Sequence, residues 1–177
     1  MERKTRKPIE ILVGSTGIRL KQFIVSDSQA IFQLIDKNRN HLSQFGDTTA
    51  EKYKTIESVE ESISNPKNPD RLRFGIWDNG VLVGSVNLTP DEDDKTKGEI
   101  GYYLGSEFTG KGYMIKAVTT LAEFAFKNLQ YKEIYGIVHA ENIASQSVLI
   151  KSGFENGGEV IGKYTKEKSM VLTLKKP

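Results

Sequence analysis

The sequence of 177 residues contains no cysteine, so disulfide bonds, thiolate zinc sites and a cysteine nucleophile are all excluded. Its two histidines, His41 and His139, lie far apart without metal-ligand spacing, and we expect no metal site. No stretch approaches the ~18–20 apolar residues of a membrane span, and no apolar segment follows the basic N-terminus as in a signal peptide. We therefore expect one cytoplasmic domain over residues 1–177, with no membrane partner.

Neither sign of charge dominates, since 25 basic and 23 acidic side chains give a formal net charge of +2. Nucleic acid is not expected as the main partner, because neutralising phosphates needs a concentrated basic surface. The single basic cluster comprises Arg3, Lys4, Arg6 and Lys7. It predicts a flexible basic tail over residues 1–8, with an RNA-contacting arm as the alternative.

Hydrophobic periodicity predicts strands and helices in mixed order. Asp78-Asn79-Gly80 is a hairpin signal, Ser26 and Asp27 are predicted to cap a first helix, and residues 41–50 are predicted to be irregular. Strands are predicted over Ile9–Val13, Ile18–Ile24, Leu72–Trp77, Val81–Leu88, Glu99–Leu104, Glu133–His139, Glu155–Gly162 and Lys168–Leu174. Further helices are predicted over Thr55–Ser64, Met114–Leu129 and Asn142–Ser152. The strand–helix–strand crossover predicts an α/β (α+β) fold in which helices pack on a mixed sheet.

A glycine-rich turn between a predicted strand and a long helix is the main candidate for ligand binding. It runs from Gly105 to Met114, and Gly110 and Gly112 let its backbone approach a ligand closely. The amides that open the next helix lack partners and lie at the positive end of the helix dipole. Together these features predict an anion site that suits a pyrophosphate, with Lys111 adding charge at the rim.

Two nucleotide-binding patterns compete for this turn. A dinucleotide fingerprint would need a third glycine where Ile115 stands. The segment Gly105–Lys111 does match the G-x-x-x-x-G-K of a phosphate-binding loop. However, the next residue is Gly112, which has no hydroxyl for a magnesium ion.

A third interpretation rests on a family resemblance. The segments Glu99-Ile100-Gly101-Tyr102-Tyr103-Leu104, Gly110-Lys111-Gly112-Tyr113, Asn142-x-x-Ser145 and Gly153-Phe154 together resemble the GNAT superfamily of N-acetyltransferases, in particular its RimJ/RimL-type branch. The resemblance implies a splayed central sheet flanked by helices, with acetyl-CoA in the splay and its pyrophosphate on the glycine-rich turn. The implied CoA-binding residues are Tyr102, Tyr103, Leu104, Thr109, Gly110, Lys111, Gly112, Tyr113, Met114, Asn142 and Ser145.

The sequence departs from the family pattern at three positions. Thr109 stands where the family usually has arginine or glutamine, and Met114 stands where a small residue is usual. Many relatives carry a proton-donating tyrosine in the last helix, where this chain has Leu149. Because backbone amides do most of the phosphate binding in this architecture, we expect weakened rather than abolished CoA binding.

Catalytic roles follow from the chemistry of amide formation. The amine must lose a proton, since an α-amine has a pKa of ~8 and a lysine-like amine ~10.4, and Glu99 is the candidate base. A backbone amide near Tyr103 or Leu104, freed by a bulge, is expected to hold the oxyanion. With the RimL-like branch as precedent, Ser145 is the candidate acid, while Asn142 caps the same helix.

The expected function is transfer of an acetyl group from acetyl-CoA to a primary amine by direct attack in a ternary complex, without a metal. The acceptor is either a protein N-terminus, such as that of a ribosomal protein, or a small amine. A CoA-binding regulator without turnover and a phosphate-loop nucleotide-binding module are the alternatives. A homodimer is one assembly to be considered.

Overall fold

One eight-stranded sheet organises the molecule, with strands in the order β1-β2-β3-β4-β5-β6-β8-β7. The computed structural model describes residues 7–162 and 166–177. Neighbouring strands are antiparallel except β5 and β6, which run parallel. The strands are β1 (Glu10–Leu12), β2 (Ile18–Gln22), β3 (Leu72–Asp78), β4 (Val81–Pro90), β5 (Lys97–Leu104), β6 (Glu133–His139), β7 (Glu155–Ile161) and β8 (Lys168–Lys175). The predicted mixed sheet is confirmed.

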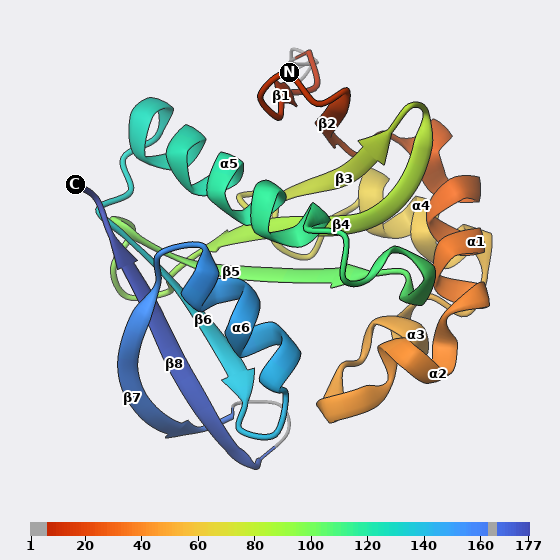
Figure 1. Ribbon diagram of the computed structural model, residues 1–177. Helices are drawn as coiled ribbons and strands as arrows, with labels where there is room; N and C mark the ends of the chain where they lie inside the picture. Colours follow the sequence, from red (N-terminus) through yellow and green to blue (C-terminus); the bar gives the residue numbers. More distant parts are fainter. Residues whose placement is uncertain (1–6, 163–165) are drawn as a thin grey trace.

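Helices cover both faces of this sheet. They are α1 (Ser28–Lys37), α2 (Arg39–Leu42), α3 (Thr49–Lys52), α4 (Ile56–Ser64), α5 (Tyr113–Asn128) and α6 (Ile143–Lys151). Figure 1 shows α5 and α6 in front of the sheet, while α1 to α4 gather beside the far ends of β4 and β5.

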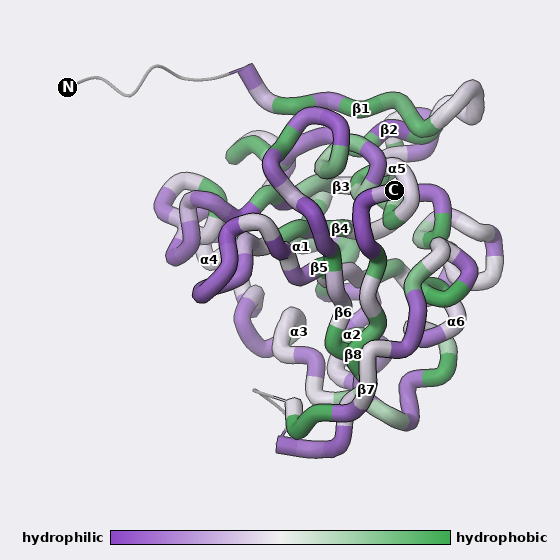
Figure 2. Tube along the Cα trace, turned by 90° about the vertical axis from the view of Figure 1, so that its left-hand side faces the viewer, coloured by the Kyte–Doolittle hydropathy of each residue, from purple (hydrophilic) through white to green (hydrophobic). Residues whose placement is uncertain are grey.

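Two hydrophobic clusters result from the alternation of side chains along the strands. On one face, Val86 of β4 and Ile100 of β5 pack with Val118 and Leu121 of α5, all at most 4% exposed. On the other face, α1 buries residues such as Ile31 and Ile35 in a second cluster. The apolar stretches lie mainly in the central strands, whereas α4 and many connecting segments are hydrophilic (Figure 2).

The predicted hairpin between β3 and β4 is confirmed. Asn79 and Gly80 both adopt positive φ angles, 48° and 84°, as a tight two-residue turn requires. The predicted bulge near Tyr103 and Leu104, however, is wrong. The β4–β5 register is uninterrupted from Gly84↔Leu104 to Pro90↔Gly98, and the irregularity lies instead between β3 and β4, at Ile76 and Trp77.

Two local predictions near the N-terminus are also wrong. Asp27 precedes α1, but its carboxylate accepts hydrogen bonds from the Ile24 amide and Lys21 Nζ rather than capping that helix. Residues 41–50 are not wholly irregular, because they contain the end of α2, a 3-10 turn over Gln44–Gly46 and the start of α3. Helices of four residues are too short to be stable alone, so local sequence did not predict them.

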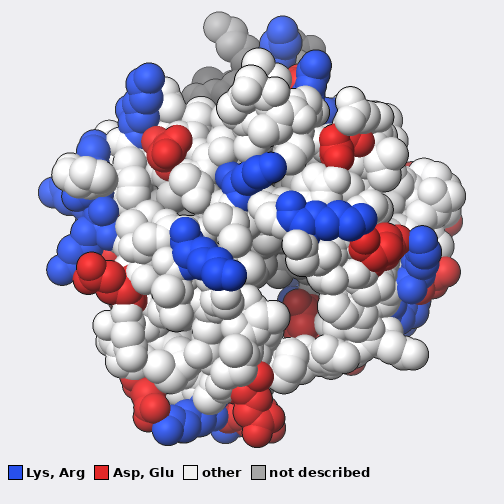
Figure 3. All heavy atoms as spheres, in the orientation of Figure 1, with Lys and Arg blue, Asp and Glu red and all other residues white. Residues whose placement is uncertain are grey.

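On the face shown in Figure 3, acidic and basic side chains are interspersed, so charge of one sign does not dominate it. Of the predicted basic tail, only Lys7 and Pro8 belong to the described residues, and both are exposed. Within the described ranges, no helix is both long and apolar enough to cross a membrane.

Candidate functional site

The site forms where β5 and β6 part. Their parallel pairing consists of three register pairs, Lys97↔Glu133, Gly98↔Ile134 and Glu99↔Tyr135. Beyond Glu99, β5 continues beside β4 alone, as far as Leu104. The sheet therefore splays, which leaves one edge of β5 without a strand partner over its second half.

Backbone direction determines which amides face this opening. The Gly105 amide donates to the Val83 carbonyl, which lies on the β4 side, at 3.0 Å. Because successive amides along a strand point to opposite sides, the Leu104 amide faces the splay and the Tyr103 amide faces β4. Of the two amides predicted to hold the oxyanion, Leu104 has the suitable direction.

A cleft of about 320 Å³ occupies the splay. Its walls come from β3, β4, β5, β6, α6 and the segment from Gln44 to Tyr53, which includes α3. The side chains that line it include Lys52, Arg71, Arg73, Ser85, Asn87, Glu99, Tyr102, Tyr103, His139, Asn142, Ser145 and Leu149. The sequence-predicted residues Glu99, Tyr102, Tyr103, Asn142 and Ser145 are thus brought into one cavity.

A pair of hydroxyl groups joins β5 to α6 inside this cleft. Tyr102 Oη lies 2.8 Å from Ser145 Oγ and 3.0 Å from the Ser145 carbonyl oxygen. Ser145 is itself fixed by the helix cap, because its amide donates to Asn142 Oδ1 at 3.1 Å. Burial raises the pKa of Tyr102 to about 12, although the hydrogen bond with Ser145 acts in the opposite direction. The phenol therefore keeps its proton at neutral pH.

Glu99 lies on the other face of β5 from Tyr102, since their positions differ by an odd number. Its side chain is half-buried and lines both the cleft and a second hollow of similar volume beside the Asp91–Asp93 loop. In that hollow, the pKa of Tyr135 is raised first by burial, then by the hydrogen bond its hydroxyl donates to Asp91, and further by the charge of Glu99. The candidate base and the candidate acid thus reach the splay from opposite sides.

The glycine-rich turn has the open geometry expected of an anion cradle. Gly110 and Gly112 have φ angles of 74° and 78°, which side-chain-bearing residues rarely adopt. A Cβ atom placed at either position would meet no protein atom within 4 Å, so the backbone faces open space. Helix α5 begins directly after Gly112, and the amides of its first turn have no acceptor within the helix.

The side chains of the turn mostly hold it in place. Met114 is 5% exposed and packs in the core, and Tyr113 donates its hydroxyl proton to Asp78. Thr109 donates to the Ser106 carbonyl at 2.8 Å. Lys111 is exposed, with its ammonium 5.7 Å from the Phe108 ring. The bulk of Met114 therefore does not obstruct the turn, and Lys111 is the turn side chain best placed to add charge.

Asn38, which directly follows α1, anchors the start of this turn. It is 3% exposed, and its Oδ1 accepts from both the amide and the hydroxyl of Ser106, each at 2.8 Å. Its Nδ2 donates to the Leu34 carbonyl at the end of α1. No local sequence pattern predicts this contact, because 68 residues separate Asn38 from Ser106.

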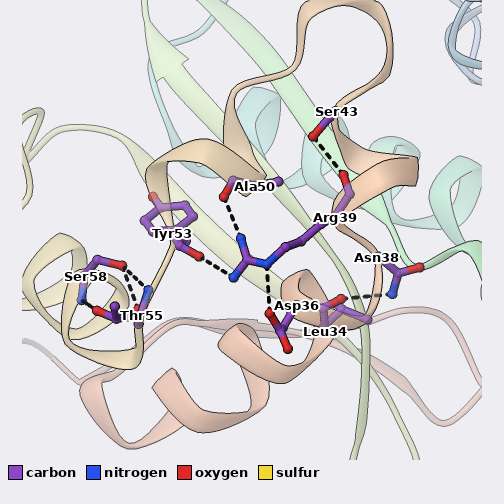
Figure 4. A network of polar contacts seen from close by, with 9 residues as sticks. All are labelled: Leu34, Asp36, Asn38, Arg39, Ser43, Ala50, Tyr53, Thr55 and Ser58. Atoms are coloured by element: carbon purple, nitrogen blue, oxygen red, sulfur yellow. Dashed lines mark hydrogen bonds and ion pairs between the residues drawn. The ribbon is translucent and has the colours of Figure 1, made fainter.

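Arg39 organises the wall of the cleft formed by the segment around α3. Its guanidinium donates to Asp36, to the Ala50 carbonyl at 2.7 Å and to the Tyr53 carbonyl at 3.2 Å, as Figure 4 shows. Because one planar guanidinium bonds to several acceptors, it fixes the conformation of this segment, which has no long helix.

Phe45 and His139 meet where the cleft borders the second hollow. Phe45 has a φ angle of 54°, and its ring centroid lies 5.6 Å from that of His139. His139 Nδ1 accepts from the Glu141 amide, and its Nε2 lies 2.6 Å from Glu167. The contact therefore holds the imidazole as a wall of the cleft.

Leu149 takes the position at which many relatives carry a tyrosine. It is fully buried, and it lines the inner end of the cleft. Leu149 carries no hydroxyl, whereas Tyr102 and Ser145 bring two hydroxyl groups to the same cleft. Among the described residues, no group of three or more His, Asp or Glu side chains could hold a metal ion.

Comparison with known proteins agrees with this geometry. The family model described as "Acetyltransferase (GNAT) domain" matches residues 18–155. "Probable N-acetyltransferase YjcK" of Bacillus subtilis (strain 168) is 30% identical over 155 residues, which cover 84% of this chain and 85% of that protein. "Uncharacterized N-acetyltransferase YoaA" of the same organism is 26% identical over 148 residues, which cover 78% and 80%.

Two solved structures with bound ligands share the fold. RimL, a ribosomal L7/L12 alpha-N-protein acetyltransferase in complex with coenzyme A, has a TM-score of 0.84 at 19% identity, over 94% of this chain and 98% of that one. The microcin C7 self-immunity acetyltransferase MccE, with acetyl-CoA and AMP, has a TM-score of 0.78 at 20% identity, over 93% and 94%. The family match favours the CoA interpretation of the glycine-rich turn over the phosphate-loop one. This chain belongs to the GNAT acetyltransferases.

Proposed function

We propose that the protein transfers an acetyl group from acetyl-CoA to a primary amine within one ternary complex. The observation that carries this proposal is the splay between β5 and β6, where Glu99 and the Tyr102–Ser145 pair reach one cleft. The glycine-rich turn connects the end of β5 to the start of α5. A donor bound on that turn can therefore extend toward the cleft.

The residues present fit acetyl-CoA, which when bound supplies an acetyl group on a thiolate leaving group. The amides from Gly110 to Met114 and the charge of Lys111 suit a pyrophosphate. The unpaired edge of β5 past Glu99 offers backbone groups to the rest of the molecule. The Leu104 amide is suited to stabilise the oxyanion, because it points into the splay.

Glu99 is the proposed general base. Its place on β5 puts the carboxylate at the last residue paired with β6, where the sheet opens. It lines both hollows on its face, so an amine entering from either one meets it. The neutral form of the amine attacks the acetyl carbon, and the carboxylate takes the proton that its nitrogen loses.

Ser145 is the proposed acid for the leaving thiolate. Its hydroxyl lies on the opposite side of β5 from Glu99, on the first turn of α6. The Asn142 cap holds that turn in place while the hydroxyl remains in the cleft. The base and the acid thus act from opposite sides of β5, one on the amine and the other on the leaving sulfur.

The acceptor belongs to one of two classes, a protein N-terminus or a small amine. Among the similar structures, one is named a ribosomal-protein-S5-alanine acetyltransferase from Vibrio fischeri and another a spermidine N-acetyltransferase chimera. The cleft carries cations at Lys52, Arg71 and Arg73, while the adjoining hollow carries the acidic Asp91–Asp93 loop. A single-domain organisation, a cytoplasmic location, a homodimer and independence from nucleic acid remain predictions.

A two-part binding and activity experiment tests this function. Thermal unfolding with and without CoA should show stabilisation, since a ligand at 100 times its Kd adds about 2.7 kcal/mol. A panel of peptides with free N-termini and of polyamines, given acetyl-CoA, should then release free thiol. No thermal shift at millimolar CoA would refute the proposal. Binding without thiol release across the panel would favour the regulator, and magnesium-dependent nucleotide binding the phosphate-loop module.

A further inference from the structure

Tyr102 and Ser145 do more than line the cleft, because they form a direct hydrogen bond with each other. Tyr102 comes from β5 and Ser145 from α6, 43 positions apart, yet their hydroxyl oxygens are 2.8 Å apart. Both residues line the cleft at the splay. Tyr102 Oη also donates to the Ser145 carbonyl at 3.0 Å, so the phenolic proton lies between that carbonyl and Ser145 Oγ.

We propose that Tyr102 is a positioning residue that orients the Ser145 hydroxyl and, through it, supplies the proton to the leaving sulfur. The inference rests on the proposed acetyl transfer and names the source of the proton that Ser145 passes on. A serine alone is a poor acid, because its own hydroxyl holds its proton far more tightly than a thiol does. A second hydroxyl that returns a proton to Ser145 in the same step lessens this difficulty, because a phenol is a stronger acid than a serine hydroxyl.

The proton transfers balance as follows. The neutral amine nitrogen forms a bond to the acetyl carbon, and the carbon–sulfur bond breaks with its electron pair on sulfur. Ser145 gives its hydroxyl proton to that sulfur and takes the phenolic proton of Tyr102. Glu99 takes the proton that the amine nitrogen loses and releases it to water in the cleft, from which Tyr102 is reprotonated. The net products are the amide and the free thiol.

Three other tyrosines near the site form hydrogen bonds elsewhere. The buried Tyr103 hydroxyl, on the opposite face of β5, bonds to Ser85. Tyr135 donates to Asp91 at 2.7 Å, and Tyr113 donates to Asp78. Leu149 has no proton to give. Tyr102 is thus the cleft tyrosine whose hydroxyl is directed at the helix that carries Ser145.

An equilibrium titration tests the inference without any acceptor. The bound CoA thiol is titrated by the ultraviolet absorbance of its thiolate in the unaltered chain and in Tyr102→Phe, Ser145→Ala and the double variant. Hydrogen bonding to the thiolate lowers the thiol pKa, so both single variants should raise it by about one unit. The double variant should match Ser145→Ala, because Tyr102 acts only through Ser145. Tyr131→Phe, which removes a hydroxyl outside the cleft, should leave the value unchanged.

Kinetics of the same variants give the second readout. Tyr102→Phe and Ser145→Ala should each lower kcat about 10–100-fold, with the affinity for CoA kept within about twofold. Residues that act as a unit are not additive, so the double variant should be no slower than the slower single variant.

The outcomes separate the two proposals. If the unaltered chain does not bind CoA, the proposed function fails and this inference with it. If CoA binds and Tyr102→Phe changes neither the thiol pKa nor kcat, only the assignment of Tyr102 is overturned. Multiplying losses in the double variant would likewise show that Tyr102 acts independently of Ser145.

Discussion

The turn before α5 and the cleft beside α6 are both proposed to bind acetyl-CoA, but different kinds of chemical group form them. In the turn, the groups offered to a ligand are backbone amides, while Tyr113 and Met114 turn their side chains toward the protein. In the cleft, the groups proposed to act are the side chains of Glu99, Tyr102 and Ser145, which come from β5 and α6.

This difference determines what each part tolerates. A site made of amides depends on backbone conformation, so Thr109 and Met114 can depart from the family pattern without removing a binding group. A site made of side chains depends on individual atoms, so one altered residue removes a function. We therefore expect substitutions in the cleft to change rates and substitutions in the turn to change affinity.

The largest expected effect concerns Glu99, the proposed base. Glu99→Gln should lower kcat by about 10²–10⁴-fold, because the amine loses its proton acceptor, while CoA affinity stays within about twofold. Thiol release and calorimetric CoA binding measure the two quantities. Glu123→Gln, an exposed change on α5, serves as the control and should alter neither. Equal losses in rate and affinity for Glu99→Gln would break the proposed division between cleft and turn.

A smaller effect is expected at the buried support of the turn. Asn38→Ala leaves the Ser106 amide without its acceptor, which should lower the free energy of unfolding by about 1–3 kcal/mol. Denaturant titration measures this loss. Asn128→Ala removes an exposed bond to the Phe124 carbonyl and should cost much less. If the two variants are equally stable, Asn38 does not support the turn.

Backbone conformation in the turn is tested by a matched pair of glycines. Gly112→Ala introduces about 1–2 kcal/mol of strain at a positive φ angle and should raise the Kd for CoA about tenfold. Gly158 also has a positive φ, 111°, and open space around its Cβ position, but it lies in β7. Gly158→Ala should therefore reduce stability similarly and leave CoA binding unchanged. Equal Kd values for the two variants would rule out a role for the turn in binding.

The smallest expected effect concerns the single charged side chain of the turn. Lys111→Ala should weaken CoA binding about two- to fivefold at low salt and less at high salt, because exposed ion pairs are weak and screened. Lys127→Ala, an exposed change in the last turn of α5, should have no effect. A loss above a hundredfold at Lys111 would mean that a side chain, not the backbone, dominates this site.

Sequence patterns predicted the parts that depend on local chemistry. The Asn79-Gly80 hairpin and the strand-to-helix turn at Gly110 and Gly112 are encoded by residues adjacent in the chain. Tyr102 contacts Ser145 and Asn38 contacts Ser106, over separations of 43 and 68 residues. Patterns of neighbouring residues therefore cannot predict either contact. The short helices around Arg39 escaped prediction for a related reason, since one side chain gathers distant carbonyls to hold them.

The short parallel seam has a mechanical consequence. Strands β1 to β5 form one part of the sheet and β6, β8 and β7 the other, and between them lie only the three register pairs that end at Glu99↔Tyr135. The two parts therefore share few backbone hydrogen bonds, and a ligand in the cleft lies where they separate. A ligand that contacts both parts of the sheet would bridge them, and the protein should be most rigid when its cleft is filled.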